Sequence, residues 1–487
     1  MTTEPTNPAA PRVVVVGGGI AGLAAAHAVR RERPDVEVVV LEASDRVGGK
    51  LRLGEVAGVT VDLGAESILN RRPEGVDLAR EAGLGSWITH PATTEARVWS
   101  RGALHPLPRS VMGVPVDVSE LASSGIVSRK GQARAAMDLA LPATTLDSGD
   151  VSVGWLIEQR LGREVLERLV EPLLGGVYAG HAREISARAA VPQVVALLER
   201  DSSLMRAASQ ALAGPASQTP VFAGVVGGVG RLPVALAAGL DVRTGVTVRD
   251  LARTSTGWSL VTGPVPAPEL LEADAVVVAV PGAPAARLLA DVAPGAALEL
   301  ASIEYASMAV VTLALRAADV PEVEGSGFLV PPVDGRQVKA ATWSFRKWEW
   351  VREAGAVATE DVLVLRASVG RHREEQALQV DDDELVARVR ADLHDAVGVT
   401  AEPVDAVVTR WGGGLPQYAV GHLDRVRRIR DHVGHLPGLA VCGAAYDGLG
   451  IPACISSAQR AAREVLDELP VSGAVGRVRF EDTPLGE

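Results

Sequence analysis

Three glycines near the N-terminus, Gly17, Gly19 and Gly22, have the spacing of a nucleotide-binding turn. The apolar run 12–16 (RVVVV) precedes them and predicts a buried strand, and the segment after them has the composition of a helix. In such a turn the first glycine permits a tight bend, the second lets a pyrophosphate approach the backbone, and the third allows close packing of helix on strand. Glu42 follows the next apolar segment, where its carboxylate can accept hydrogen bonds from ribose hydroxyls and would repel a 2′-phosphate. The pattern predicts a Rossmann-type dinucleotide site.

A second glycine-rich group lies directly after Glu42. It consists of Arg46, Gly48, Gly49 and Lys50, in the order R-x-G-G-K. Residues 62–66 (DLGAE) follow twelve residues later. A site for NAD does not need this second glycine pair, whereas a longer cofactor does, because its ribityl chain continues along the backbone. The two groups together therefore favour FAD.

A third pattern lies near the C-terminus, at residues 438–466. An apolar segment ends at Gly443, a glycine-rich loop follows, and a helix is expected to begin near Ile451 and Pro452. Proline suits the first helical turn, where its missing N–H removes no hydrogen bond. The free N–H groups and the partial positive charge of such a helix start would stabilise the negative charge of a reduced flavin.

These three patterns resemble those of the flavin amine oxidase and protoporphyrinogen oxidase superfamily. The resemblance implies that FAD is bound without a covalent link and that Val248 contacts the adenine through its backbone. It also extends the set of cofactor-binding residues. The added residues are Ile20, Ala21, Ala43, Gly64, Ala65, Glu66, Ser67, Gly450 and Ile455.

Four further segments resemble the porphyrinogen oxidases of haem synthesis, and among these the type that forms coproporphyrin. They are residues 171–180 (EPLLGGVYAG), 96–108 (ARVWSRGALHPLP), 62–69 with Arg71 and Arg72, and 410–426 (RWGGGLPQYAVGHLDRV). The resemblance implies oxidation of coproporphyrinogen III to coproporphyrin III in three two-electron flavin cycles, with O2 as acceptor and release of H2O2. It further implies that a backbone carbonyl near Gly176 polarises a pyrrole N–H. Arg97 first, and then Arg71 and Arg72, are expected to hold substrate propionates.

Three other functions stay open at this point. The first is oxidation of protoporphyrinogen IX, which has two propionates fewer. The second is the activity of an amine oxidase or a carotenoid-type desaturase. Aromatic residues make up only 3% of the chain, which disfavours the aromatic cage that an amine cation would need. The third is a flavin-bearing protein without catalytic activity.

The composition excludes several classes of protein. A net charge of −12 disfavours nucleic-acid binding, and the sequence shows neither a metal-ligand motif nor an apolar run long enough to span a membrane. No signal peptide precedes the first apolar strand, and the two cysteines, Cys442 and Cys454, are expected to be free thiols, so a cytoplasmic location is predicted. Peripheral membrane contact through residues 101–220 and a coproporphyrin ferrochelatase as partner stay open. The chain contains four lysines, Lys50, Lys130, Lys339 and Lys347.

The order of apolar and polar segments predicts a protein of α/β and α+β class with several domains. The FAD-binding domain is expected at 1–72, 221–291 and 436–470, and thus from discontinuous segments. A substrate-binding domain with a mixed sheet is expected at 73–100 and 292–435, and a helical subdomain at 101–220. Residues 1–11 are expected to form a disordered leader, and 471–487 a flexible tail.

Overall fold

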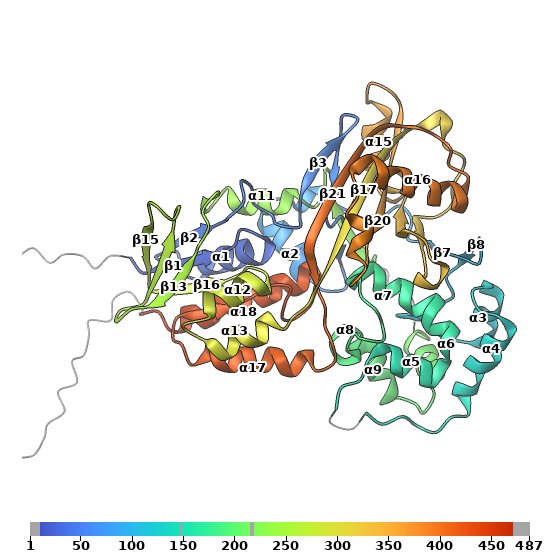
Figure 1. The fold of residues 1–487 in the computed structure, drawn as a ribbon, viewed down its shortest axis with the longest axis horizontal. Coiled ribbons are helices and arrows are strands. Elements are labelled where there is room, and N and C mark those ends of the chain that lie inside the picture. The colour runs from blue at the N-terminus through green and yellow to red at the C-terminus, as the bar shows by residue number, and fades with distance from the viewer. Residues whose placement is uncertain (1–9, 147–148, 215–218, 471–487) are drawn as a thin grey trace, which may run out of the picture.

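The computed structural model describes residues 10–146, 149–214 and 219–470, and a parallel sheet of five strands within these ranges forms the centre of one lobe (Figure 1). In spatial order the strands are β12 (Asp241–Arg243), β2 (Glu37–Leu41), β1 (Arg12–Val16), β16 (Ala275–Val278) and β22 (Leu439–Val441). All neighbouring pairs are parallel. Valine fills most of the central positions because both faces of the sheet are covered. The strands come from three distant parts of the chain, as predicted.

Helices cover both faces of this sheet. One face packs against α1 (Ile20–Glu32), α2 (Glu74–Glu81), α11 (Arg231–Ala237) and α18 (Ile451–Asp467). The other face packs against the antiparallel strands β13 (Asp250–Arg253), β14 (Trp258–Thr262) and β15 (Glu269–Ala273) and the helices α12 (Gly282–Leu289), α13 (Pro294–Ala301) and α17 (His422–Gly434). Three of these helices, α2, α13 and α17, lie in the ranges expected for the substrate-binding domain. Their apolar faces pack in the same cores as the parallel sheet, so the packing extends beyond the expected boundaries.

A mixed sheet of seven strands, counted within the described ranges, forms the second lobe (Figure 1). Its order is β21 (Pro403–Pro416), β17 (Tyr305–Arg316), β20 (Val362–Val369), β19 (Val338–Thr342), β18 (Gly327–Leu329), β7 (Ala96–Ser100) and β8 (Ala103–Pro106). Helix α16 (Asp382–Val397) packs on one face. The register between β19 and β20 shifts between Val338 and Ala340, so Lys339 is the extra residue of a β-bulge.

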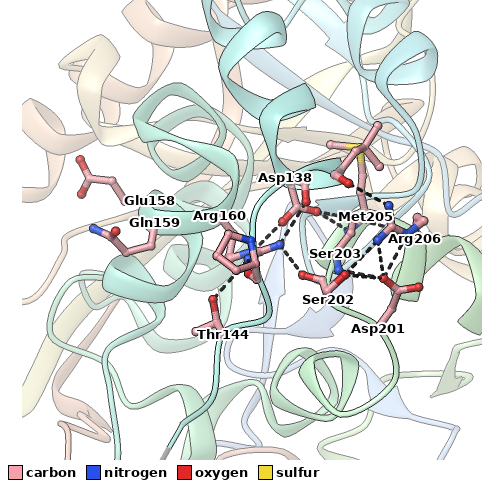
Figure 2. A network of polar contacts seen from close by, with 12 residues as sticks. Asp138, Thr144, Glu158, Gln159, Arg160, Asp201, Ser202, Ser203, Met205 and Arg206 are labelled. Atoms are coloured by element: carbon pink, nitrogen blue, oxygen red, sulfur yellow. Dashed lines mark hydrogen bonds and ion pairs between the residues drawn. The ribbon is translucent and has the colours of Figure 1, made fainter.

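Short helices gather beside the mixed sheet and form a core of their own (Figure 1). They are α3 (Val118–Ser124), α4 (Arg129–Ala136), α5 (Val153–Leu161), α6 (Arg163–Val165), α7 (Glu171–Tyr178), α8 (Ala187–Ala190), α9 (Pro192–Leu198) and α10 (Leu204–Ala211). A buried ion pair between Arg160 and Asp138 joins α5 to the segments around it (Figure 2). These helices, together with the parallel sheet and the mixed sheet, confirm the α/β and α+β class.

Smaller elements connect the lobes. They are the hairpin β3 (Leu53–Val56) and β4 (Val59–Asp62), the sheet of β5 (Ile68–Leu69), β11 (Phe222–Val225) and β6 (Ile88–Thr89), the pair β9 (Ser110–Val111) and β10 (Val114–Pro115), and the helices α14 (Ser344–Lys347) and α15 (Glu349–Ala356). No helix within the described ranges is both long and apolar enough to cross a membrane. The expected tail 471–487 and most of the expected leader lie outside the described residues.

Candidate functional site

A cavity of about 1020 Å³ runs between the parallel sheet, the mixed sheet and α7. It is lined by Gly17, Glu42 and Val248 in the nucleotide-binding lobe and by Gly176 and Ala340 on the opposite side. Ligand pockets usually measure about 300–1,000 Å³, so this cavity lies at the upper limit of that range. Its size and position suit a site that holds a long cofactor and a substrate together.

The turn between β1 and α1 has the backbone that its glycines predict. Gly17 has φ of +110°, a conformation that L side chains rarely adopt. A Cβ on Gly22 would lie 1.8 Å from the carbonyl oxygen of Gly17, so only glycine allows α1 to pack this closely against the strand end. An added Cβ on Gly19 would meet no atom within 4 Å, and Gly19 lines the cavity. The backbone of the turn is therefore open to a ligand.

The carboxylate of Glu42 is fixed at the end of β2. One oxygen accepts a hydrogen bond from the backbone N–H of Gly18 at 2.7 Å, and the other accepts bonds from the N–H and the hydroxyl of Ser44 at 2.8 and 2.7 Å. A carboxylate has about four acceptor positions, so Glu42 can accept further bonds from a ribose. Val248 lies on the same wall of the cavity.

Two helices begin at the cavity. α1 starts after Gly19, and α18 starts after Gly450 with Pro452 in its first turn. Residues at both starts line the cavity, namely Ile20, Ala21, Ile451 and Cys454. The N–H groups in the first turn of each helix and the helix dipoles attract negative charge at two separate places. A dinucleotide needs such positions for its pyrophosphate and, in FAD, for the pyrimidine end of the flavin, so these residues fit FAD.

Glu66 is held by two cations beneath the cavity wall. Its carboxylate accepts from Nζ of Lys347 at 2.6 Å and from the guanidinium of Arg366 at 2.8 Å. Burial alone would raise the pKa of Glu66, but Lys347 and Arg366 outweigh it and lower the pKa to about 2. Glu66 and Arg366 both line the cavity. The network fixes the segment after β4 to α14 and β20 and keeps Glu66 ionised at neutral pH.

Asp62 anchors a second loop near the cavity. Its carboxylate accepts from the backbone N–H groups of Val229 and Gly230, at 2.8 and 2.9 Å, at the start of α11. Burial raises the pKa of Asp62 to about 6, although these hydrogen bonds lower it. Asp62, the first residue of the D-L-G-A-E segment, therefore joins two parts of the chain that lie far apart in the sequence.

The wall opposite the nucleotide-binding turn is mostly apolar. This wall is formed by residues of α7, β17 and β19. They are Gly176, Val177, Met308, Val310 and Ala340. A Cβ on Gly176 would have its nearest contact at 3.6 Å, on Leu329, so the position has room for a larger residue. This end of the cavity can take a large apolar ligand.

Most of the predicted cofactor-binding residues line the cavity. These are Gly17, Gly19, Ile20, Ala21, Glu42, Ala43, Gly48, Gly49, Lys50, Gly64, Ala65, Glu66, Ser67, Val248, Gly443, Gly450 and Ile451. Gly22, Arg46, Pro452 and Ile455 are not among the lining residues. Arg46 donates to the carbonyls of Val47 and Gly49, and Ile455 is fully buried in the core beneath. The predicted roles of these residues stay predictions.

The arginines expected to hold propionates lie elsewhere. Arg97 is on β7, where it pairs with Glu324. Arg72 pairs with Glu74 at 2.5 Å, and Arg71 is exposed. None of the three lines the cavity. Their assignment stays a prediction that the cavity geometry does not support.

Sequence reasoning missed Lys347 and Arg366, the two partners of Glu66. Lys347 lies 281 positions after Glu66 in the chain, and Arg366 lies 300 positions after it, so no local spacing could reveal them. One signal was present, the scarcity of lysine. Of the four lysines, Lys50 lines the cavity, Lys347 pairs with a lining residue and Lys339 contacts one.

Known proteins resemble the chain over almost its whole length. The model of the family described as flavin containing amine oxidoreductase matches residues 20–466. A protein of Mycobacterium tuberculosis (strain ATCC 25618 / H37Rv) named coproporphyrinogen III oxidase is 39% identical over 470 residues, covering 93% of this chain and 97% of the relative. Human protoporphyrinogen oxidase is 29% identical over 497 residues, covering 94% and 99%. A crystal structure from Exiguobacterium sp. 255-15, named as a candidate protoporphyrinogen oxidase, aligns with a TM-score of 0.83 and 32% identity over 94% of this chain and 99% of that one.

Proposed function

Because the chain belongs to the family of flavin-containing amine oxidoreductases and is an FAD-dependent oxidoreductase, we propose that it oxidises coproporphyrinogen III to coproporphyrin III. The observation that carries the proposal is the cavity of about 1020 Å³, which joins a site fit for FAD to a large apolar wall. A tetrapyrrole is a large, mostly apolar ligand, and the cavity offers such a ligand direct access to the flavin position. The 39% identity to a coproporphyrinogen III oxidase supports this substrate over others.

The proposed reaction removes six electrons and six protons from the macrocycle. When bound, FAD supplies a two-electron acceptor, so three cycles are needed. With O2 as the final acceptor, one coproporphyrinogen III and three O2 give one coproporphyrin III and three H2O2, which balances atoms and electrons. The reaction belongs to haem biosynthesis, and its product would pass to a chelatase that inserts the metal. We place the protein in the cytoplasm, with a coproporphyrin ferrochelatase as the proposed partner.

The residues of the chain have three roles in this proposal. The start of α18 supplies N–H groups and a partial positive charge at the flavin end of the cavity. Glu66, ionised and fixed by Lys347 and Arg366, keeps the wall rigid around the reacting centre. The backbone near Gly176 accepts a hydrogen bond from a pyrrole N–H and orients the ring. No strong general base is required, since the released protons come from N–H groups that become acidic as the ring is oxidised.

Oxidation of protoporphyrinogen IX is the second candidate, favoured by the 29% identity to the human enzyme of that name. An amine substrate is less well supported. An amine cation is held by aromatic faces, and Tyr305 and Trp411 are the aromatic residues among those that line the cavity in the described part of the chain. The indole N–H of Trp411 donates to the carbonyl of Leu63, so this ring is already fixed in the wall.

The test is a porphyrin-fluorescence assay on the purified yellow protein, with coproporphyrinogen III and protoporphyrinogen IX prepared without oxygen and compared in parallel. We expect kcat/KM to favour the tetracarboxylate and three H2O2 to form for each porphyrin. A preference for the dicarboxylate would move the protein to the second candidate. Porphyrin formation no faster than without enzyme would refute both, and peroxide released from simple amines would then indicate an amine oxidase.

A further inference from the structure

A buried lysine that has no anionic partner among the described residues lies against the apolar end of the cavity. Lys339 is 2% exposed, so its amino group does not reach solvent along an apolar stem as surface lysines do. Within the described residues, its Nζ contacts the thioether sulfur of Met308 at 3.8 Å. It forms no ion pair with a carboxylate of the described residues, although a buried cation normally has such a partner.

The β-bulge places this amino group on the cavity side of the mixed sheet. Lys339 is the extra residue between Val338, which packs in the core on the far face, and Ala340, which lines the cavity. Bulges change the direction of a side chain in this way. Met308, which Nζ contacts, also lines the cavity, so a single side chain separates Nζ from the space where a substrate would lie.

The electrostatic surroundings favour an anion at this position. Arg371 is the charged residue that acts on Lys339, and it is itself a cation, 6% exposed. The carboxylate of Glu374 is 3.8 Å from the guanidinium of Arg371 and is 48% exposed. The guanidinium also donates to the carbonyls of Arg336 and Val330, at 3.4 Å each. Glu171 and Asp392 also act on Arg371, so its charge is balanced within the protein. No carboxylate of the described residues acts in this way on Lys339, so the charge of Lys339 is the one without a balancing anion.

We propose that the Lys339 ammonium binds a carboxylate of the substrate, with Arg371 contributing to the positive potential around it. This inference rests on the proposed function. It assigns the binding of a substrate propionate to Lys339 and not to Arg97, Arg71 or Arg72. Movement of the flexible Met308 side chain opens the path between Nζ and the cavity. The desolvated carboxylate then supplies the partner that the described protein lacks.

The first experiment measures equilibrium binding of coproporphyrin III and of its tetramethyl ester to the FAD-loaded enzyme by quenching of tryptophan fluorescence. The variant is Lys339→Met, which keeps an unbranched side chain one atom shorter and removes the charge. The matched control is the exposed Lys130→Met on α4. A charge-assisted hydrogen bond contributes about 1.5–3 kcal/mol, so we expect Lys339→Met to weaken binding of the acid about 10- to 100-fold. Binding of the ester should be the same in all three proteins.

The second experiment follows turnover of coproporphyrinogen III. Lys339→Met should raise KM about tenfold or more and change kcat by less than about threefold, because the carboxylate is bound equally in the ground and transition states. Lys339→Arg, which keeps the charge, should restore most of the affinity and also serves if the methionine variant folds poorly. A structural role alone would not distinguish the acid from the ester.

The outcomes separate the inference from the proposed function. If the wild type oxidises coproporphyrinogen III and Lys339→Met binds the acid as tightly as Lys130→Met does, the inference is wrong and the function stands. Equal weakening for acid and ester would also overturn it, since the lysine would then act only on the shape of the wall. If the wild type forms no porphyrin, the proposed function fails and the inference fails with it.

Discussion

The helical core and the cavity each contain a buried cation, and the two are held in opposite ways. Arg160 and Lys339 are both 2% exposed. Arg160 donates to the carboxylate of Asp138 at 2.6 Å, to the carbonyl of Pro142 at 2.6 Å and to the carbonyl of Ser202, as Figure 2 shows in part. Lys339 has one thioether sulfur at 3.8 Å. A cation that serves the fold has its hydrogen bonds satisfied within the protein, and one that lacks them destabilises the free protein, which suggests a role in binding.

The largest effect is expected at Arg160. Arg160→Met leaves Asp138 buried with Ser203 and the N–H of Met205 as its remaining partners. Loss of one partner of a buried ion pair should lower the free energy of unfolding by about 3–5 kcal/mol. The control is the exposed Arg163→Met on α6, whose pair with Glu167 should contribute about 0.5 kcal/mol or less. Thermal and urea unfolding check this, and equal stability of the two variants would break the comparison.

Lys339→Met should have the opposite effect and raise the free energy of unfolding. Burial lowers the pKa of Lys339 to about 7 from an ordinary value of 10.5. The unfolded chain therefore binds more protons than the folded protein between these pH values, and wild-type stability rises with pH across this window. The variant should be more stable by roughly 3 kcal/mol at pH 8 and should lose that part of the rise. Urea unfolding of both proteins from pH 7 to pH 10 measures it, and a less stable variant with the wild-type slope would refute the account.

Lys347 sharpens the contrast because it is a partly buried lysine that does have an anionic partner, Glu66. Lys347→Met leaves Glu66 with Arg366 alone and should lower the free energy of unfolding by about 1–3 kcal/mol. Release of FAD on heating, followed by the rise in flavin fluorescence, should also begin at a lower temperature, since Glu66 lines the cavity. Lys130→Met is again the control. Stabilisation by Lys347→Met would show that pairing does not distinguish these lysines.

The smallest expected effect is a transfer of protons. At pH 8 Lys339 is mostly neutral, and a bound carboxylate should restore its charge, so binding of coproporphyrin III should take up as much as about one proton. The charged group acting on Lys339 is Arg371, which stays charged throughout this range. Calorimetry in two buffers of different ionisation enthalpy gives the number of protons. Uptake of the same size in Lys339→Met would assign the proton to another group.

The sequence predicted the parts of the fold that depend on local patterns. The valine run of β1, the glycines of the turn and the proline at the start of α18 each identify their element within a few residues. Contacts between distant segments could not be predicted. The sequence of residues 241–262 could not show that β12 joins the parallel sheet while β13 and β14 pair with each other. The partner of Arg97 could not be predicted for the same reason, because Glu324 lies 227 positions away in the chain.

Lys339 shows why residues proposed to bind the substrate were the hardest part to predict from the sequence. Its sequence neighbours, in the order Q-V-K-A-A-T, read as an ordinary strand in which a lysine would face solvent. Lys339 faces the cavity wall instead because of the β-bulge, and the bulge depends on the pairing of β19 with β20. The cofactor site was easier, because most of its lining comes from short segments whose glycines are fixed by backbone geometry.

The most direct test of the account is a crystal structure of the FAD-bound enzyme with coproporphyrin III. We expect the porphyrin between α7 and the β17–β20–β19 face, with one propionate about 3 Å from Nζ of Lys339 and Met308 moved aside. A porphyrin in this cavity with every propionate directed to solvent, and Nζ still on the sulfur of Met308, would contradict the assigned role of Lys339. A porphyrin bound only outside the cavity would contradict the proposed site as a whole.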